Sequence, residues 1–234
     1  TILDQYLKSD HAVFPVHPQI LEAGVWDPYI EKTVSKGKPL PALRVCPSSS
    51  TRTLYVEGQN AFPHALKVHF PFRISRYDRK MRDEVVAQAV AVSGELEKGI
   101  SSFEPGFSMM REVLGISHQN LDPGSLRGEN WGFLVRDLSP FPHSKIQTRL
   151  IPGFALYGKD YFDPKSRAVL LDLVGDSPPV SFVLDHIMLP IVRQWCTCFS
   201  CFGFMLEPHG QNLILETDTR GNIIRTVHRD LSLG

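Results

Sequence analysis

The spacing of hydrophobic residues changes along this chain, and that change constrains its fold more than any other feature. Up to about residue 80, apolar residues come in short runs separated by prolines, a pattern typical of strands. The runs lie at residues 13–16, 43–45, 53–56 and 66–70. From Arg82 to Lys98 the spacing is helical, and Gly99 follows where such a helix should end. The sequence therefore predicts an α+β fold with a β-rich N-terminal region.

The second half of the chain is expected to be more helical. A long helix is predicted over residues 181–205, with a kink or a break at Pro190 because proline lacks a backbone donor. Strands are expected at residues 131–137 and 149–157.

Two further patterns organise the chain. Apolar runs at residues 213–217 and 223–227 flank a Gly-containing turn, which predicts a β-hairpin. Residues 123–128 contain Pro-Gly and Arg-Gly pairs typical of a loop. We therefore place a boundary there and expect two regions, residues 1–125 and 126–234.

Composition excludes several classes of protein. The 234 residues carry 25 basic and 25 acidic side chains and are 42% hydrophobic, whereas disordered chains combine low hydrophobicity with high net charge. No apolar stretch reaches the roughly 18–20 residues of a membrane span. No Lys/Arg block is present, which argues against a nucleic-acid partner. The chain begins at Thr1 and ends just after a dense polar cluster, which predicts that it is a fragment of a longer protein.

The four cysteines also bear on function. Three form a Cys-x-Cys-x-x-Cys string at Cys196, Cys198 and Cys201, a spacing that can ligate a metal or an iron–sulfur cluster. Aromatic residues surround the string, so a buried helix in which cysteine acts as a small hydrophobe is favoured. Because the spacing is not that of a disulfide framework, and no signal peptide is visible, we expect a cytoplasmic protein.

The densest polar signal lies on either side of the predicted hairpin. Before it stand Glu207, His209, Gln211 and Asn212, and after it comes the run His228-Arg229-Asp230. The fold-back of a hairpin brings these two ends together, and carboxylate and amide oxygens are ligands that suit Mg²⁺. His209 can donate to an anion or transfer a proton. The alternative is a polar loop whose side chains satisfy backbone groups.

A second cluster precedes a predicted strand. Ser48-Ser49-Ser50-Thr51-Arg52-Thr53 supplies hydroxyls, backbone amides and one guanidinium, which together form a phosphate-binding surface. It is not a Walker A sequence. An ordinary Ser-rich turn accounts for the composition equally well.

Two smaller features point to an anionic ligand. Basic and hydroxyl side chains gather at Lys67, His69, Arg73, Ser75, Arg76 and Arg79. This cationic stretch suits a small anionic substrate, although a solvated basic face is the usual explanation. His17 lies between Pro15 and Pro18, which would hold it rigidly against a ligand or shape a turn.

Two motifs point to a phosphotransferase instead. The run from His228 to Leu231 matches the start of a protein-kinase catalytic loop, but the Gly-rich loop and the Asp-Phe-Gly sequence of kinases are absent. His209-Gly210-x-Asn212 resembles a loop of small-molecule phosphotransferases, which need an acidic base where this chain has Gln211.

Taken in order, these segments resemble the family of siderophore synthetases that act independently of non-ribosomal peptide synthetases, the relatives of aerobactin synthetase. The resemblance is carried by Phe14 to Gln19, Ser48 to Leu54, Leu66-Lys67, Ile74 to Arg79, Glu207-x-His209-x-Gln211-Asn212 and Arg229-Asp230. Here the first segment lacks the family's tryptophan, and Ser75 replaces its threonine.

The resemblance implies a β-rich fingers region, a more helical palm region containing the hairpin, and an ATP cleft between them. It implies a ligase that adenylates a citrate-like polycarboxylate with ATP and Mg²⁺, and condenses it with an amine, hydroxylamine or alcohol. A homodimer is implied by analogy. A phosphotransferase and a non-catalytic nucleotide- or carboxylate-binding domain remain the alternatives.

The resemblance also implies roles for single residues. His209, Arg79 and Lys67 would be catalytic, and His17, Ser75 and Arg79 would bind the substrate. Glu207, Asn212 and Asp230 would hold Mg²⁺. The residues implied to bind ATP are Ser49, Ser50, Arg52, Thr53, Gln211 and Asn212.

Overall fold

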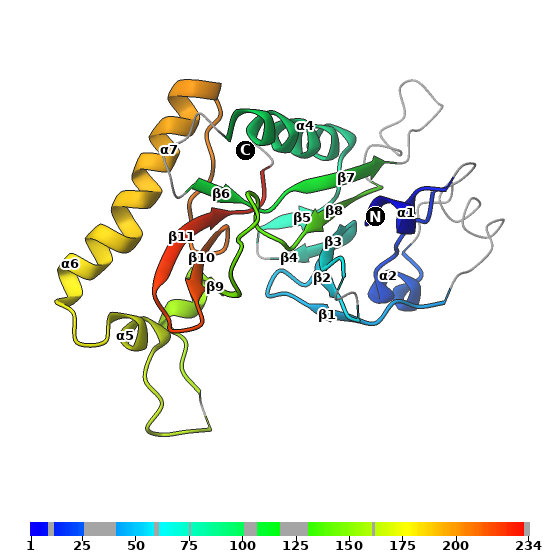
Figure 1. Cartoon of the computed structure of the whole chain (residues 1–234). Coiled ribbons are helices and arrows are strands. Elements are labelled where there is room, and N and C mark those ends of the chain that lie inside the picture. Colours follow the sequence, from blue (N-terminus) through cyan, green and yellow to red (C-terminus); the bar gives the residue numbers. More distant parts are fainter. Residues whose placement is uncertain are drawn as a thin grey trace. The chain divides into compact units, whose positions relative to one another are not determined.

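Helices and strands both build the protein, which confirms the predicted α+β class (Figure 1). The computed structural model describes residues 1–8, 12–25, 41–58, 61–74, 76–100, 107–117, 131–160 and 162–231. Within these residues, no helix combines the length and the apolar character that a membrane span needs.

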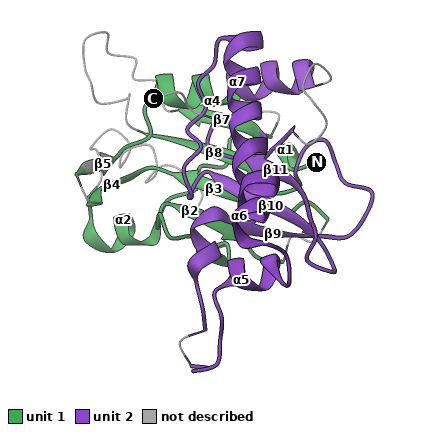
Figure 2. Cartoon of the chain, turned by 90° about the vertical axis from the view of Figure 1, so that its left-hand side faces the viewer, with its two compact units in different colours: residues 1–91, 112–139 green, residues 92–111, 140–234 purple. Residues whose placement is uncertain are grey.

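The chain divides into two compact units (Figure 2). Unit 1 consists of residues 1–91 and 112–139, and unit 2 of residues 92–111 and 140–234. The expected boundary near residue 125 lies between two strands that pair with each other in unit 1. The two compact units are therefore divided at other points of the chain. Pairing between distant strands, rather than loop composition, sets the compact units.

Unit 1 is built on a five-stranded antiparallel sheet with the order β1-β2-β3-β8-β7. Its strands are β1 (Val45–Pro47), β2 (Thr53–Val56), β3 (His64–Val68), β7 (Glu112–Ser117) and β8 (Gly132–Asp137). The predicted strands at residues 53–56 and 131–137 are thereby confirmed. A separate two-stranded ribbon contains β4 (Phe70–Ile74) and β5 (Tyr77–Arg79).

The core of unit 1 lies against the central strands. Buried apolar side chains come from Tyr6, Leu54, Val56, Leu66, Val68, Phe133 and Val135. The strand expected at residues 13–16 is wrong: residues 13–17 have no regular structure, because the flanking prolines cannot donate to a ladder. Phe14 nevertheless packs on the core, with its ring 5.1 Å from that of Phe133.

Among the described residues, the first part of the chain also contains three helices. They are α1 (Leu3–Tyr6), α2 (Pro18–Ala23) and α4 (Asp83–Gly99). Helix α4 lies within one residue of the predicted position at each end. Its first half belongs to unit 1 and its second half to unit 2, with Val86 and Ala89 buried in one and Val92 and Leu96 in the other.

Unit 2 contains a four-stranded sheet with the order β6-β11-β10-β9. Its strands are β6 (Phe107–Met109), β9 (Thr148–Pro152), β10 (Leu213–Asp218) and β11 (Ile223–His228). Strands β10 and β11 form the predicted hairpin, and β6 joins β11 in parallel. The strand expected at residues 149–157 ends early, at Pro152, and a 3₁₀ turn, η3 (Gly153–Tyr157), follows it.

The long helix of unit 2 is confirmed, and Pro190 does not break it. Helix α6 (Pro179–Val183), a π turn η4 (Leu184–Met188) and helix α7 (Leu189–Phe202) follow one another without a gap (Figure 1). A short helix, α5 (Val169–Val174), precedes them. Proline is tolerated in the first turn of α7, and the wider π turn before it accommodates the missing donor.

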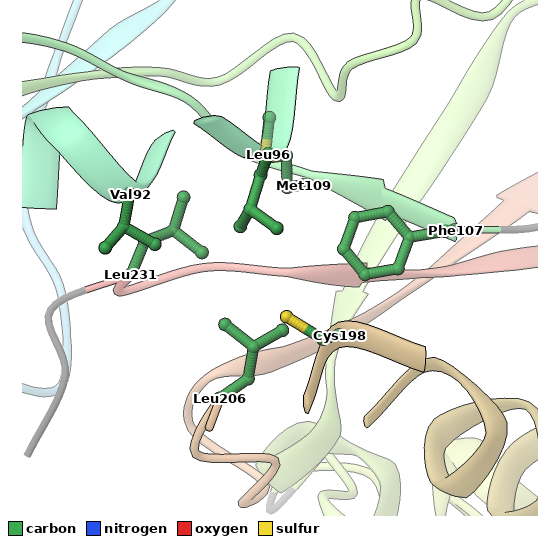
Figure 3. Packing of buried hydrophobic residues seen from close by; sticks show 7 residues of the cluster. All are labelled: Val92, Leu96, Phe107, Met109, Cys198, Leu206 and Leu231. Carbon is green, nitrogen blue, oxygen red and sulfur yellow. The ribbon is translucent and has the colours of Figure 1, made fainter. Parts of the chain in front are cut away.

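The core of unit 2 joins α4, β6 and α7 (Figure 3). Its buried residues are Val92, Leu96, Phe107, Met109, Cys198, Leu206 and Leu231. Cys198 is fully buried and acts as a small hydrophobe, as favoured above, and burial raises the pKa of its thiol to about 11. Cys196 and Cys201 are exposed, which corrects the expectation of a wholly buried string.

Candidate functional site

The Ser-rich segment of unit 1 forms the turn between strands β1 and β2. Backbone bonds close it: the Thr51 amide donates to the Ser48 carbonyl at 2.9 Å, and the Arg52 amide to the Ser50 carbonyl at 2.7 Å. The hydroxyls of Ser48 and Ser50 lie 2.9 Å apart. Thr51 has a φ of 59°, a conformation that a β-branched residue rarely adopts. The turn is therefore tightly defined, and we call residues 48–52 the Ser turn.

Arg52 connects the Ser turn to the segment between β5 and α4. Its Nη1 donates to the carbonyls of Arg79 at 3.2 Å and Lys80 at 3.5 Å. Across the sheet, Thr53 lies opposite Lys67, whose side chain is buried on β3. The structure thus brings together four of the residues assigned to phosphate and charge binding. Ser75 lies outside the described residues.

His17 lies beside the Ser turn rather than on a free surface. It caps α2, with Nδ1 accepting from the Gln19 amide at 3.2 Å, and the nearby backbone of Thr51 partly offsets the effect of burial on the pKa of His17. The ring is 7% exposed and meets Phe70 edge to face, with 4.7 Å between centroids. Burial lowers the pKa of His17.

His69 is a buried neutral histidine next to this cluster. Its ring stacks on Trp131 at 4.6 Å, and Nδ1 accepts from the Met81 amide at 3.4 Å. Burial, followed by the charges of Lys80 and Arg52, lowers the pKa of His69 to about 4. The stacking partner lies 62 positions further along the chain, so sequence spacing contained no sign of it.

This pKa predicts that the protein loses stability in mild acid. An unfolded histidine has a pKa near 6.5, so between pH 6.5 and 4 the unfolded chain binds a proton at residue 69 that the folded chain does not. Stability from this group is fully present above pH 6.5 and falls as the pH drops toward 4. Urea unfolding across this range should show the slope, and His69→Gln should reduce it while the exposed His186→Gln does not. An unchanged slope in His69→Gln would contradict a neutral buried ring.

The polar residues of unit 2 form a tight turn before β10. The Asn212 amide donates to the His209 carbonyl at 2.9 Å, and the Gln211 amide donates to His209 Nδ1 at 3.2 Å. His209 Nε2 lies 3.1 Å from the side-chain amide of Asn212 and 3.7 Å from a Glu207 carboxylate oxygen. The imidazole is 52% exposed, so it is oriented by neighbours and still accessible to a ligand.

The hairpin places the residues after β11 beside this turn. The Arg229 amide donates to the Asn212 carbonyl at 2.9 Å, and Arg229 Nε donates to the Gln211 carbonyl at 2.7 Å. Asp230 follows with a φ of 64°. The predicted fold-back therefore joins the two ends of the polar signal.

Backbone packing on the opposite side also holds the turn. Gly210 accepts from the Phe154 amide at 2.8 Å. A Cβ atom at Gly153 would lie 3.0 Å from the Gly210 oxygen, so any larger residue there would force the backbone of the turn to shift. The early end of β9, which the sequence pattern did not indicate, therefore supports the polar turn.

Unit 2 also contains a buried group of hydrogen-bonded side chains that the sequence did not predict. Gln194 of α7 lies 8% exposed, with its Oε1 accepting from the Thr226 hydroxyl at 2.5 Å and lying 2.8 Å from His228 Nε2. Burial lowers the pKa of His228 to about 4. His228 ends strand β11, so it does not occupy a kinase-like catalytic loop. A glutamine inside the predicted amphipathic helix was the one sign of this buried group in the sequence.

The described residues include oxygen atoms that can ligate a metal, but they do not form a complete metal-binding site. Among them, no three His, Cys, Asp or Glu side chains are grouped to hold an ion. Glu207 is 54% exposed, and Asn212 is buried with its amide toward His209. Such a set fits Mg²⁺, which usually takes one or two carboxylates and completes its shell with water and substrate phosphates.

Comparison with known proteins gives matches of sequence and of fold. Residues 2–158 match the model of the IucA/IucC family. The petrobactin biosynthesis protein AsbB from Bacillus anthracis str. Sterne superposes with a TM-score of 0.73 at 22% identity, covering 94% of this chain and 37% of that one. A comparison with curated proteins found no match.

Two aerobactin synthetases from a hypervirulent pathotype of Klebsiella pneumoniae share the same fold. ATP-bound IucA superposes with a TM-score of 0.68 at 18% identity, covering 99% of this chain and 43% of that one. IucC superposes with a TM-score of 0.70 at 17% identity, covering 97% and 40%. This chain thus spans well under half the length of each of the three solved structures.

Proposed function

The chain belongs to the IucA/IucC family, and from this premise we propose that it is part of an ATP-dependent siderophore synthetase. The protein would join a citrate-like polycarboxylate to an amine, hydroxylamine or alcohol. Its whole reaction would use ATP with Mg²⁺, in keeping with the ATP-bound state of IucA, which shares its fold.

One observation supports this proposal most. The polar turn of unit 2 is fastened to the residues after the hairpin by Arg229, through bonds of 2.9 and 2.7 Å to the backbone of Asn212 and Gln211. His209 lies within this scaffold, and its side chain stays half exposed. This combination supports a role for the imidazole in contacting an anion.

The proposed chemistry has two steps. A substrate carboxylate oxygen attacks the α-phosphorus of ATP, the bond to the bridging oxygen breaks, and pyrophosphate leaves with that electron pair. The amine, hydroxylamine or alcohol then attacks the acyl carbon, loses its proton, and expels AMP to give an amide or ester. The first step brings two anions together, so cationic groups must offset their repulsion and stabilise the charge that develops on the phosphates.

In unit 1 the residues fit the phosphate and charge-binding part of this chemistry. Ser49, Ser50, Arg52 and Thr53 would bind phosphate oxygens at the Ser turn and the start of β2. Lys67 and Arg79 would offset the charge of the phosphates or of the substrate carboxylates. A substrate-binding role for Ser75 and Arg79 rests on the resemblance alone.

In unit 2 the residues fit the reacting end. His209 would contact the attacking carboxylate or the α-phosphate, and Gln211 and Asn212 would bind the nucleotide. Glu207, Asn212 and Asp230 would hold Mg²⁺, which supplies positive charge to the polyphosphate when bound. The half-exposed Glu207 carboxylate suits an ion that keeps part of its water shell.

We expect the full-length protein to release pyrophosphate and AMP from ATP only when a polycarboxylate is present, and to form a hydroxamate when hydroxylamine is the acceptor. Arg52→Ala should reduce pyrophosphate release about tenfold, because one charge-assisted contact to phosphate is lost. The matched control is Arg44→Ala, since Arg44 is exposed and meets only Glu57 at 3.4 Å among the described ion pairs.

The products distinguish the alternatives. Formation of ADP and a phosphorylated substrate would contradict adenylation and identify a phosphotransferase. Binding of ATP without release of pyrophosphate in the full-length protein would identify a domain that binds the nucleotide without turning it over.

A further inference from the structure

The long helix of unit 2 contributes one buried polar side chain to the end of strand β11. Gln194 on α7 is 8% exposed, and its Oε1 accepts from the Thr226 hydroxyl at 2.5 Å. The same oxygen lies 2.8 Å from His228 Nε2. Because a carbonyl oxygen can only accept, Nε2 of His228 carries a proton and is the donor. One amide oxygen thus binds two side chains on the same face of β11, since residues two apart on a strand point the same way.

The end of β11 at His228 is held by several elements of unit 2. Its backbone pairs with Leu213 of β10, and its carbonyl accepts from the Met110 amide at 2.8 Å. Its ring stacks on Phe107 of β6, with 5.6 Å between centroids. Gln194 adds the bond from α7. Strand ends open more readily than strand centres, so the side-chain bonds at this end help to decide how firmly the last residue is held.

The residue that follows His228 carries the bonds that hold the polar turn. The Arg229 amide donates to the Asn212 carbonyl at 2.9 Å, and Arg229 Nε donates to the Gln211 carbonyl at 2.7 Å. The same two residues orient the His209 ring. The Gln211 amide donates to Nδ1 at 3.2 Å, and the side-chain amide of Asn212 lies 3.1 Å from Nε2. A shift of Arg229 would therefore move the groups that orient the imidazole.

From these contacts we propose that Gln194 is a positioning residue of the candidate site. It holds the end of β11 so that Arg229 keeps the polar turn, and with it the His209 imidazole, in place. The inference rests on the proposed role of His209 in adenylation. It gives α7, which lies outside the hairpin and the polar turn, a part in orienting the reacting end.

Replacement of Gln194 by methionine tests this role. Gln194→Met keeps the length of the side chain but removes the acceptor of Thr226 and His228, so the end of the strand should loosen. We expect kcat/KM for pyrophosphate release by the full-length protein to fall about tenfold, because a small misplacement of a reacting group slows the reaction. Gln194→Glu retains an accepting oxygen and should stay within about threefold of wild type. Gln88→Met, the same change at a half-buried position of α4, is the matched control and should retain the wild-type rate.

A double variant distinguishes the positioning of His209 from general damage to the protein. If Gln194 acts through the placement of the imidazole, its loss matters little once the imidazole is gone. We therefore expect Gln194→Met to lower the remaining rate less than about twofold in a His209→Ala background. A loss of the same size with and without the imidazole would contradict the proposal and leave Gln194 with a structural role alone.

Hydrogen exchange tests the end of the strand without catalysis. In the full-length protein without nucleotide, exchange of the Arg229 amide should quicken about tenfold in Gln194→Met. Amides in the middle of β10 should keep their protection, which shows that unit 2 remains folded. Quickened exchange at Arg229 in a protein that releases no pyrophosphate would support the positioning of the turn by Gln194 and contradict the proposed function. Unchanged exchange at Arg229 would overturn the inference, whatever the rate of pyrophosphate release.

Discussion

Removal of the His209 imidazole is expected to lower kcat/KM for pyrophosphate release about 100-fold, the loss typical of one preorganised group that stabilises developing charge. The ring is oriented at Nδ1 by the Gln211 amide, and Nε2 faces Asn212 and Glu207. Because its side chain is 52% exposed, His209→Ala should leave folding intact. Steady-state pyrophosphate release with ATP and polycarboxylate both varied measures the effect.

The control for this variant is another exposed histidine of unit 2. His186→Ala removes an imidazole whose only described ring partner is Phe182, at 4.9 Å, and should retain the wild-type rate. His209→Gln should recover part of the loss, since an amide can still donate to an anion. A rate for His209→Ala within about threefold of wild type would return the polar turn to a purely structural role.

Arg136→Ala is expected to reduce the free energy of unfolding by about 3–5 kcal/mol, the cost of breaking a buried ion pair. Arg136 on β8 lies opposite Glu112 on β7, and its Nε donates to the Glu112 carboxylate at 2.8 Å. Their side chains are 4% and 0% exposed, so truncation would leave a buried carboxylate without its main counter-charge. Urea unfolding at pH 7 measures the loss.

Replacement of both partners separates the cost of leaving one buried charge unpaired from the net contribution of the ion pair to the free energy of unfolding. Glu112→Leu with Arg136→Met should recover most of the loss, because apolar groups of similar volume need no counter-charge. The exposed pair of Arg44 and Glu57, with side chains 89% and 48% exposed, serves as control, and Arg44→Ala should leave stability nearly unchanged. A double variant as unstable as Arg136→Ala would mean that side-chain shape, not charge, dominates at this position.

Local sequence patterns correctly predicted the elements that depend mainly on contacts between residues close in sequence. The helix expected at residues 82–98 and the hairpin at residues 213–227 lie where apolar spacing and a turn residue agree. The failures lie where tertiary contacts decide. Phe14 belongs to an apolar run, yet it packs on Phe133 from an irregular segment, because its neighbouring prolines cannot join a ladder.

In the candidate site, too, some contacts could be predicted from local sequence patterns and others could not. Glu207 to Asn212 and Arg229 were expected to meet because a hairpin must return its chain, and they do. The contact of the His17 ring with Phe70 was not foreseeable, since it joins residues 53 positions apart. Gln194 likewise reaches β11 only after the long helix packs on the sheet.

The two described tryptophans lie in different units and in different surroundings. Trp131 of unit 1 stacks on the neutral ring of His69, and the indole of Trp195 in unit 2 donates to the Leu206 carbonyl at 3.0 Å. An aromatic stack and a carbonyl bond influence indole emission differently. With the third tryptophan, Trp26, replaced, the protein thus carries one tryptophan per unit, and variants that keep only one of them can follow the unfolding of each unit separately by tryptophan emission.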